Sequence, residues 1–119
     1  MEQEKRKVVV QKLKKQESLS LDIAIKYYSI LSAINNLDLT PRKIQLIAFT
    51  AIKGNISYKS NRDEFCEKYK SSGPTINNLI SELKGLNILV KDSGKIKVNP
   101  AILLNFENDI ILQLNLLHG

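Results

Sequence analysis

The sequence predicts a mainly α-helical domain that carries a small β wing. Two observations predict it: apolar residues recur at helical spacing in several segments, and one short segment alternates apolar and polar residues about a turn. The chain has 119 residues, of which 43% are hydrophobic and 6% aromatic. This size and composition suit a single domain with its own core, and they are too apolar for a disordered chain.

Residues 1–17 predict a basic arm or short strand outside the core. This segment holds six Lys or Arg residues against three acids, and KRKVVVQKLKK places three β-branched residues between basic ones. From residue 20 onward, helical spacing predicts an extra N-terminal helix that stops near Asn35 and Asn36. The apolar residues of this helix are Ile23, Tyr27, Ile30, Leu31 and Ile34.

The segment LTPRKIQLIAFTAIKG predicts a second helix with a physical reason for each end. Thr40 is a favourable N-cap, Pro41 suits the first helical position, and Gly54 suits the position just after the last turn. The helix is apolar almost all round, so neighbours must cover several of its sides. The predicted centre of the core is Ile44, Leu46, Ile47, Phe49 and Ala51, and NISY follows as a short strand.

Two shorter helices are predicted on either side of the turn SSGP. The first begins at Asn61, which with Glu64 has the spacing of a capping box, and the second is opened by Pro74. The inward stripe of the second helix is Ile76, Leu79, Ile80, Leu83 and Leu86.

The segment ILVKDSGKIKVNP predicts a β-hairpin that Pro100 closes. Its inward residues are predicted to be Ile88, Val90, Ile96 and Val98, about a turn at residues 92–94. Residues 101–119 form an apolar C-terminal extension with two acids and no Lys or Arg. The stretch DIILQLNLL fits both a strand and a helix, and alternation about Gln113 and Asn115 favours the strand.

This order of elements resembles the winged helix–turn–helix family over residues 38–100, within a domain that spans 18–100. The run INNLISELKGLNILVKDSGKIKVNP is similar to small winged-helix proteins of tailed bacteriophages and, more distantly, to plasmid replication initiators. The resemblance implies that the second helix of the turn enters the major groove of DNA while the wing contacts phosphates. The implied DNA-binding residues are Thr75, Asn77, Asn78, Ser81 and Lys84 on the helix and Lys91, Lys95 and Lys97 on the wing.

The chemistry of this helix supports two interpretations. Asn can bond adenine through two hydrogen bonds, and Lys neutralises phosphate. Glu82, however, lies on the same outer side and would face a polyanion, and the helix offers no Arg to read guanine. The same polar residues are also typical of the solvated face of any amphipathic helix.

No enzyme is predicted, and no cofactor or metal site. Cys66 is the single cysteine, no His or Cys pair has metal-ligand spacing, and no glycine belongs to a phosphate-binding loop. The chain has no run of about 18 apolar residues and no signal-peptide pattern, so we expect it in the cytoplasm of a host cell or in a virion, away from membranes.

The first functional hypothesis is a structural or adaptor subunit that docks in a larger assembly, such as a connector or ring of a tailed-phage virion. Its partners would be other protein subunits, copies of itself included, and no small-molecule substrate is expected. The terminal segments would extend a partner's sheet through Val8, Val10, Ile110, Leu112 and Leu114. The alternative is a duplex-DNA-binding transcription regulator or replication initiator, which the net charge of +6 favours.

Overall fold

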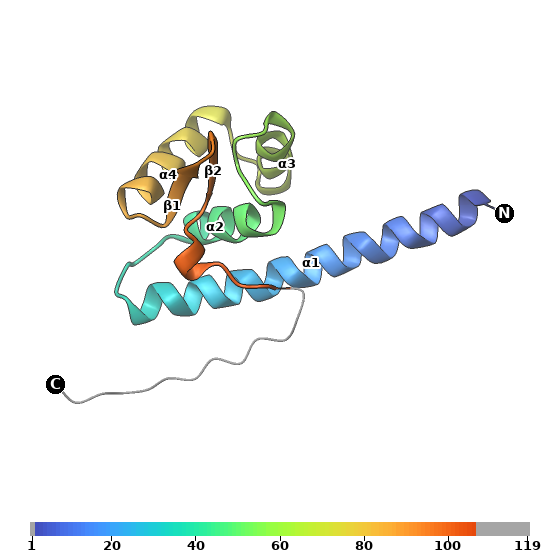
Figure 1. The fold of residues 1–119 in the computed structure, drawn as a ribbon, viewed down its shortest axis with the longest axis horizontal. Helices are drawn as coiled ribbons and strands as arrows, with labels where there is room; N and C mark the ends of the chain where they lie inside the picture. The colour runs from blue at the N-terminus through green and yellow to red at the C-terminus, as the bar shows by residue number, and fades with distance from the viewer. Residues whose placement is uncertain (1, 107–119) are drawn as a thin grey trace.

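The computed structural model describes the backbone of residues 2–106 and the side chains of residues 16–106. Within them the elements are α1 (Glu2–Ile34), α2 (Pro41–Lys53), α3 (Lys59–Tyr69), α4 (Gly73–Gly85), β1 (Leu89–Asp92), β2 (Lys95–Val98) and the 3-10 helix η1 (Pro100–Ile102). Helix α2 lies between α1 on one side and the layer of α3, α4 and the hairpin on the other (Figure 1). The prediction of a mainly helical chain with a small β element is confirmed.

Helix α1 is longer than the sequence predicts. The prediction of an arm or strand in residues 1–17 is wrong, because Glu2–Ile34 is one helix that contains Val8 and Val10. The predicted boundary between residues 17 and 18 therefore falls inside a helix. Once a helix has formed, each added residue gains a hydrogen bond at little cost, and the Lys, Glu, Gln and Leu residues around the three valines are good helix formers.

Helix α2 begins and ends where the sequence predicts. The Thr40 hydroxyl accepts a hydrogen bond from the Lys43 N–H, and Gly54, at a φ of 92°, donates its N–H to the Thr50 carbonyl. Leu46 to Thr50 are five consecutive buried residues, whereas Ile44 and Ala51 at the edges are partly buried. A helix with no exposed side over this stretch is the centre of the core, as predicted.

Helix α3 starts two residues before Asn61, so the predicted capping box is wrong. The N-cap is Tyr58, which makes no side-chain capping bond. Instead, the buried Asn55 accepts hydrogen bonds on its side-chain oxygen from the Ser57 and Tyr58 N–H groups, both at 3.0 Å. Asn61 donates to the Asn55 carbonyl. The turn at Asn55 thus sets the start of α3, because an Asn side chain readily replaces a backbone turn.

Residues 55–58, predicted as a short strand, form a turn that is tied to the hairpin. The Ile56 N–H donates to the Ile96 carbonyl at 2.9 Å, and the Ile96 N–H donates to the Ser57 hydroxyl at 2.7 Å. These two bonds satisfy the inner edge of β2 without a full third strand.

Helix α4 buries Ile76, Ile80 and Leu83, as predicted, while Leu79 is partly buried and Leu86 is 48% exposed. The last prediction fails because α4 ends at Gly85, and a residue beyond the last turn no longer follows the helical stripe.

The hairpin pairs β1 with β2 in antiparallel register, with Leu89 opposite Val98. Ser93 and Gly94 form a two-residue turn with φ of 53° and 79°, as the tightest hairpins require. This register buries Leu89 with Val98, whereas Val90 is only partly buried. The prediction that Val90 points inward is therefore wrong, because the buried residue of β1 is Leu89, one position earlier. A shift of one residue places a side chain on the other face of a strand.

The start of the C-terminal extension packs on α1. The Tyr28 hydroxyl donates to the Ile102 carbonyl at 2.9 Å, and the Phe106 ring lies 5.7 Å from the Tyr27 ring and 5.6 Å from the Tyr28 ring. Burial, helped by the neighbouring Tyr27, raises the pKa of Tyr28, so its hydroxyl stays protonated. The candidate docking residues Ile110, Leu112 and Leu114 lie in residues 107–119, outside the described part of the chain. Among the described helices, none is long and apolar enough to cross a bilayer.

Replacing a buried residue of α4 should lower the stability of the folded chain. We expect Leu83→Ala to lower the free energy of unfolding by about 2–5 kcal/mol, because Leu83 is fully buried and the change leaves a cavity in a small core. Leu86→Ala is the matched control, and its effect should stay within about 0.5 kcal/mol. Urea denaturation followed by circular dichroism measures both, and equal effects would show that α4 does not pack as described.

Candidate functional site

The predicted DNA-reading residues of α4 are exposed, and three of them share its outer face. Because Ile76, Ile80 and Leu83 face the core, the opposite side of the helix presents polar groups to solvent. All five predicted helix residues, Thr75, Asn77, Asn78, Ser81 and Lys84, are exposed. Asn77, Asn78 and Ser81 share the outer surface, whereas Thr75 and Lys84 are nine residues apart, which is half a turn around the helix, and lie on opposite flanks.

The N-terminus of α4 is capped by its own residues. The Ser72 hydroxyl accepts a hydrogen bond from the Thr75 N–H and donates to the Thr75 hydroxyl at 2.9 Å. The Thr75 side chain is thereby held against the cap, and Asn77, Asn78 and Ser81 are the exposed polar residues of the outer face.

Arg62 of α3 reaches the outer face of α4. Its guanidinium donates a hydrogen bond to the side-chain oxygen of Asn77. The bond joins the two helices and puts a cation beside the amide of Asn77, which is one of the predicted base-reading residues. The Arg62 bond uses one of the two lone pairs of the amide oxygen, and the Asn77 amide nitrogen can still donate to a ligand.

The charge of Glu82 is balanced inside the protein. Its carboxylate lies 2.5 Å from the Lys43 ammonium of α2, with the Lys43 side chain 22% exposed and that of Glu82 54% exposed. The ion pair partly neutralises Glu82, the acid that would repel a polyanionic partner. The same pair also engages Lys43, one of the cations near α4.

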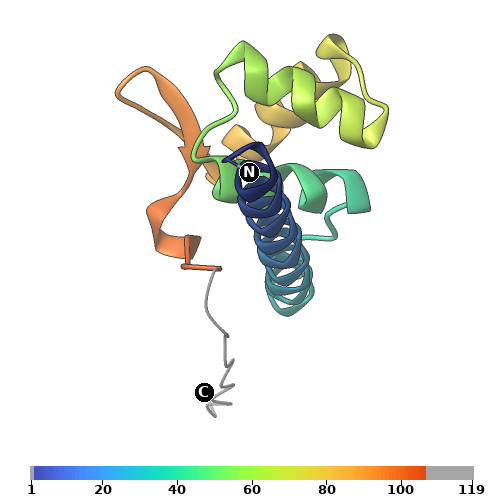
Figure 2. The ribbon, with the colours of Figure 1, turned by 90° about the vertical axis from the view of Figure 1, so that its right-hand side faces the viewer.

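The three wing lysines do not form one surface. Directly opposed residues of an antiparallel pair lie on the same face, and Asp92 faces Lys95 while Val90 faces Lys97. Lys91 faces Ile96 and so lies on the other face of the hairpin. Figure 2 shows the hairpin tip extending away from the helices, and its residues Asp92, Ser93 and Gly94 are exposed.

Lys95 and Tyr58 form a small cationic and aromatic cluster between the wing and α3. The Lys95 ammonium lies 4.9 Å from the centre of the Tyr58 ring, and half of the Tyr58 surface is exposed. Lys97 lies 3.7 Å from the Asp92 carboxylate, which reduces the charge that it offers to a ligand. The cluster presents one cation and one phenol hydroxyl, both of which can bond a phosphate or a carboxylate.

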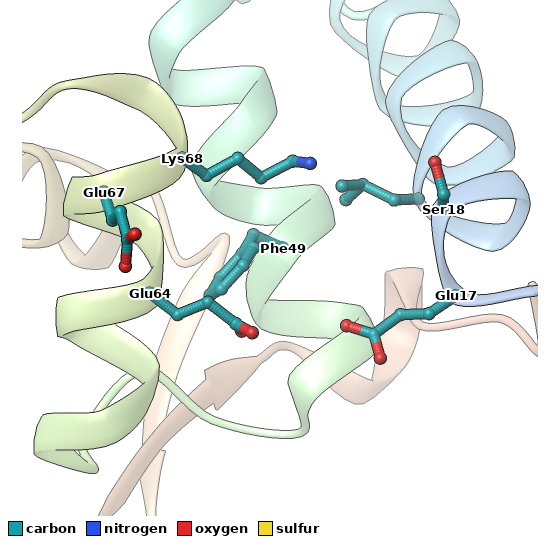
Figure 3. Close-up of a pocket in the computed structure, with 7 residues that line it drawn as sticks. Glu17, Ser18, Phe49, Glu64, Glu67 and Lys68 are labelled. Carbon is teal, nitrogen blue, oxygen red and sulfur yellow. The ribbon is translucent and has the colours of Figure 1, made fainter. Parts of the chain in front are cut away.

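A second candidate surface is a depression of about 430 Å³ between α1, α2 and α3. Figure 3 shows Glu17 and Ser18 of α1 on one side, Glu64, Glu67 and Lys68 of α3 on the other, and Phe49 between them. The floor is apolar and the rim is charged, so the chemistry suits an amphipathic protein segment better than a compact substrate.

Lys53 pairs with two of the acids that line this depression. Its ammonium pairs with the Glu17 carboxylate and lies 2.7 Å from that of Glu64. Burial lowers the pKa of Lys53, but the hydrogen bonds to both carboxylates outweigh it and raise the pKa overall. The lysine therefore stays charged and links α1 to α3 through the end of α2.

No catalytic arrangement emerges from the described residues. No group of three or more His, Cys, Asp or Glu side chains in this part of the chain could hold a metal ion. Cys66 is partly buried and packs against the core.

Sequence reasoning missed Arg62 and Tyr58. Both lie at the start of α3. The capping box predicted at Asn61 placed the start of the helix too late, so the residues of the true first turn were not identified. The usable signal was Asn55, because an Asn before an N-terminal turn predicts a helix that begins three to four residues later.

Breaking the Lys53 ion pairs should weaken the attachment of α1 to the body. We expect Lys53→Met to lower the free energy of unfolding by about 0.5–2 kcal/mol at low salt, as two partly exposed pairs are lost, and by less at high salt. The fully exposed Lys59, which pairs with Asp63 within α3, supplies the control Lys59→Met, whose effect should be smaller. Denaturation at two salt concentrations measures both, and a Lys53 effect independent of salt would argue against ion pairing.

Comparison with protein-family models, curated proteins and solved structures finds no match to this chain. The candidate surfaces are thus defined by the geometry of the described residues. They are the outer face of α4 with Arg62, the Tyr58–Lys95 cluster, and the depression beside α1.

Proposed function

We propose that the chain is a non-enzymatic winged-helix adaptor subunit that docks in a larger assembly, such as a connector or ring of a tailed-phage virion. Its partners are other protein subunits, copies of itself included. The observation that carries this proposal is the shape of α1, a 33-residue helix of which only the second half packs against the body.

The winged-helix assignment is supported by the order of the elements after α1. Helices α3 and α4 meet across the short turn of residues 70–72, and a hairpin follows α4 directly. The turn at residues 55–58 bonds to β2 through Ile56 and Ser57, in the place where a third strand of a wing sheet would lie. The same architecture serves many functions, so the docking role is argued from α1 instead.

The first half of α1 extends past the body with no other described element beside it (Figure 1). Along the described side chains of α1, burial begins only at Ser20, and residues 16–19 are exposed. A helix of about 12–15 residues without tertiary contacts is marginal in water. A sequence that keeps such a helix gains most of its stability when the segment packs on a partner.

Removing the projecting half should abolish assembly and leave the body folded. We expect the full chain to form an oligomer in solution and a chain without residues 2–16 to be monomeric, because the docking segment is gone. Sedimentation velocity measures the mass. Circular dichroism checks that the truncated chain keeps its helical body.

A pair of point variants tests whether docking requires residues 2–16 to be helical or only to be present. Val9→Pro breaks the helix in the projecting half, whereas Val9→Ala preserves it. The first should dissociate the oligomer and the second should not. If the truncated chain and Val9→Pro assemble like the full chain, docking through α1 is contradicted.

Duplex-DNA binding is the second candidate, as a transcription regulator or replication initiator. The observation that favours it is the position of Arg62, which adds a cation to the outer face of α4 beside Asn77. Lys84 and Lys91 are also exposed, and no ion pair ties either of them within the described residues. Together these groups offer hydrogen bonds to base edges and charge to phosphates.

A DNA binder should lose affinity steeply as salt is added. If the α4 face contacts DNA, Arg62→Gln and Lys95→Gln should each weaken binding and lower the salt dependence by about one released ion. Lys26→Gln, on the exposed side of α1, is the control and should behave like the parent chain. Fluorescence anisotropy with mixed duplexes measures the affinity. Equal losses in all three variants would mean only nonspecific charge attraction.

A further inference from the structure

An apolar stripe runs along the side of α1 that faces away from the body. Its spacing of four, four, three and four residues keeps its members within roughly a quarter of the helix circumference. Leu19, Ile30 and Ile34 are 56%, 42% and 52% exposed. The complete outward stripe is Leu19, Ile23, Tyr27, Ile30 and Ile34, with Ile23 and Tyr27 partly buried at its inner edge.

The exposed members of the stripe lie away from the buried residues that hold α1 on the body, which are Leu21, Ala24 and Tyr28. Ile23 and Tyr27 form the edge of the stripe that also packs against the core, where the Tyr27 ring meets Phe106. Single exposed apolar residues are common on any surface, but here three exposed residues, with the partly exposed Ile23 and Tyr27 between them, form an apolar patch along about 22 Å of helix. Patches of this kind mark protein contacts.

We propose that the outward stripe pairs with the same stripe of a second copy, with the two α1 helices antiparallel. Leu19 then faces Ile34 of the second copy, and Ile23 faces Ile30. Both pairs share one midpoint, between Lys26 and Tyr27, so a single two-fold axis there aligns four of the five stripe residues with one another and places Tyr27 beside the axis. The inference rests on the proposed assembly role. It adds a contact between copies along residues 19–34 to the docking of residues 2–16, so that loss of either contact dissociates the pair.

Charge selects the antiparallel direction. Residues 2–15 hold six Lys or Arg against two acids, so a parallel pair would bring two basic segments together. In the antiparallel pair each basic segment begins beside the C-terminal end of the other α1 and continues past it. That end carries the negative pole of the helix dipole, has no basic residue in its last turn, and leads to the exposed Asp38.

The central test measures the mass of the full chain across a range of concentrations by sedimentation equilibrium. We expect Ile30→Asp to raise the dissociation constant of the pair by roughly 100-fold or more, because two unpaired carboxylates would be buried near the axis. Leu86→Asp is the matched control, since Leu86 is equally exposed but lies at the end of α4, and it should leave the constant unchanged.

The direction of pairing is tested by disulfide trapping in a Cys66→Ser background, which removes the single native thiol. Chains with Leu19→Cys and chains with Ile34→Cys, tagged to differ in mass, are mixed and oxidised. The antiparallel pair predicts the mixed dimer as the main product. Dimers of each variant with itself would indicate parallel helices and overturn the proposal.

The outcomes for the stripe and for assembly are distinct. If Ile30→Asp stays as oligomeric as the parent chain while the truncation of residues 2–16 dissociates it, the stripe proposal falls and the assembly role stands. If the parent chain is monomeric at every concentration, self-pairing is overturned together with docking between copies.

Discussion

The burial of α2 on every side is the constraint on which the rest of the structure depends. Five consecutive residues, Leu46 to Thr50, are removed from solvent, which a helix achieves only when neighbours surround it. Helix α1 covers one side, and α3, α4 and the hairpin cover the others. The one polar side chain in the run, Thr50, donates its hydroxyl to the Leu46 carbonyl at 2.7 Å, so its burial leaves no unsatisfied group.

The ends of α2 fix the directions of the elements around it. At the first turn Lys43 pairs with Glu82 of α4, and at the last turn Lys53 pairs with Glu17 of α1 and Glu64 of α3. Burial of the apolar centre contributes more to stability than these partly exposed ion pairs, which mainly orient the helices. One consequence is that α1 leaves the body at Glu17, just where its projecting half begins.

Local signals predicted α2 completely, since Thr40, Pro41 and Gly54 act within one helical turn of the residues that they cap. The errors arose where a nonlocal or competing interaction decided the outcome. The Asn55 turn overrode the capping box at Asn61, and helix propagation overrode the β preference of the valines at residues 8–10.

The candidate surfaces were predictable only in part, for a related reason. Helical periodicity placed Asn77, Asn78 and Ser81 on one exposed face. Helical periodicity could not predict the bond from Arg62, because that bond joins two different helices. It also could not predict the face of the hairpin on which Lys91 lies, because that face depends on the strand register. Contacts between elements require the relative placement of those elements, and no single segment encodes it.

The central claim is that the projecting half of α1 is a docking element, and amide hydrogen exchange tests it most directly. Exchange in residues 2–16 is compared with exchange in α2 over a range of protein concentrations. The account predicts that α2 is protected throughout, whereas protection of residues 2–16 rises with concentration as copies dock. Fast exchange of residues 2–16 at every concentration, with α2 protected, would contradict it.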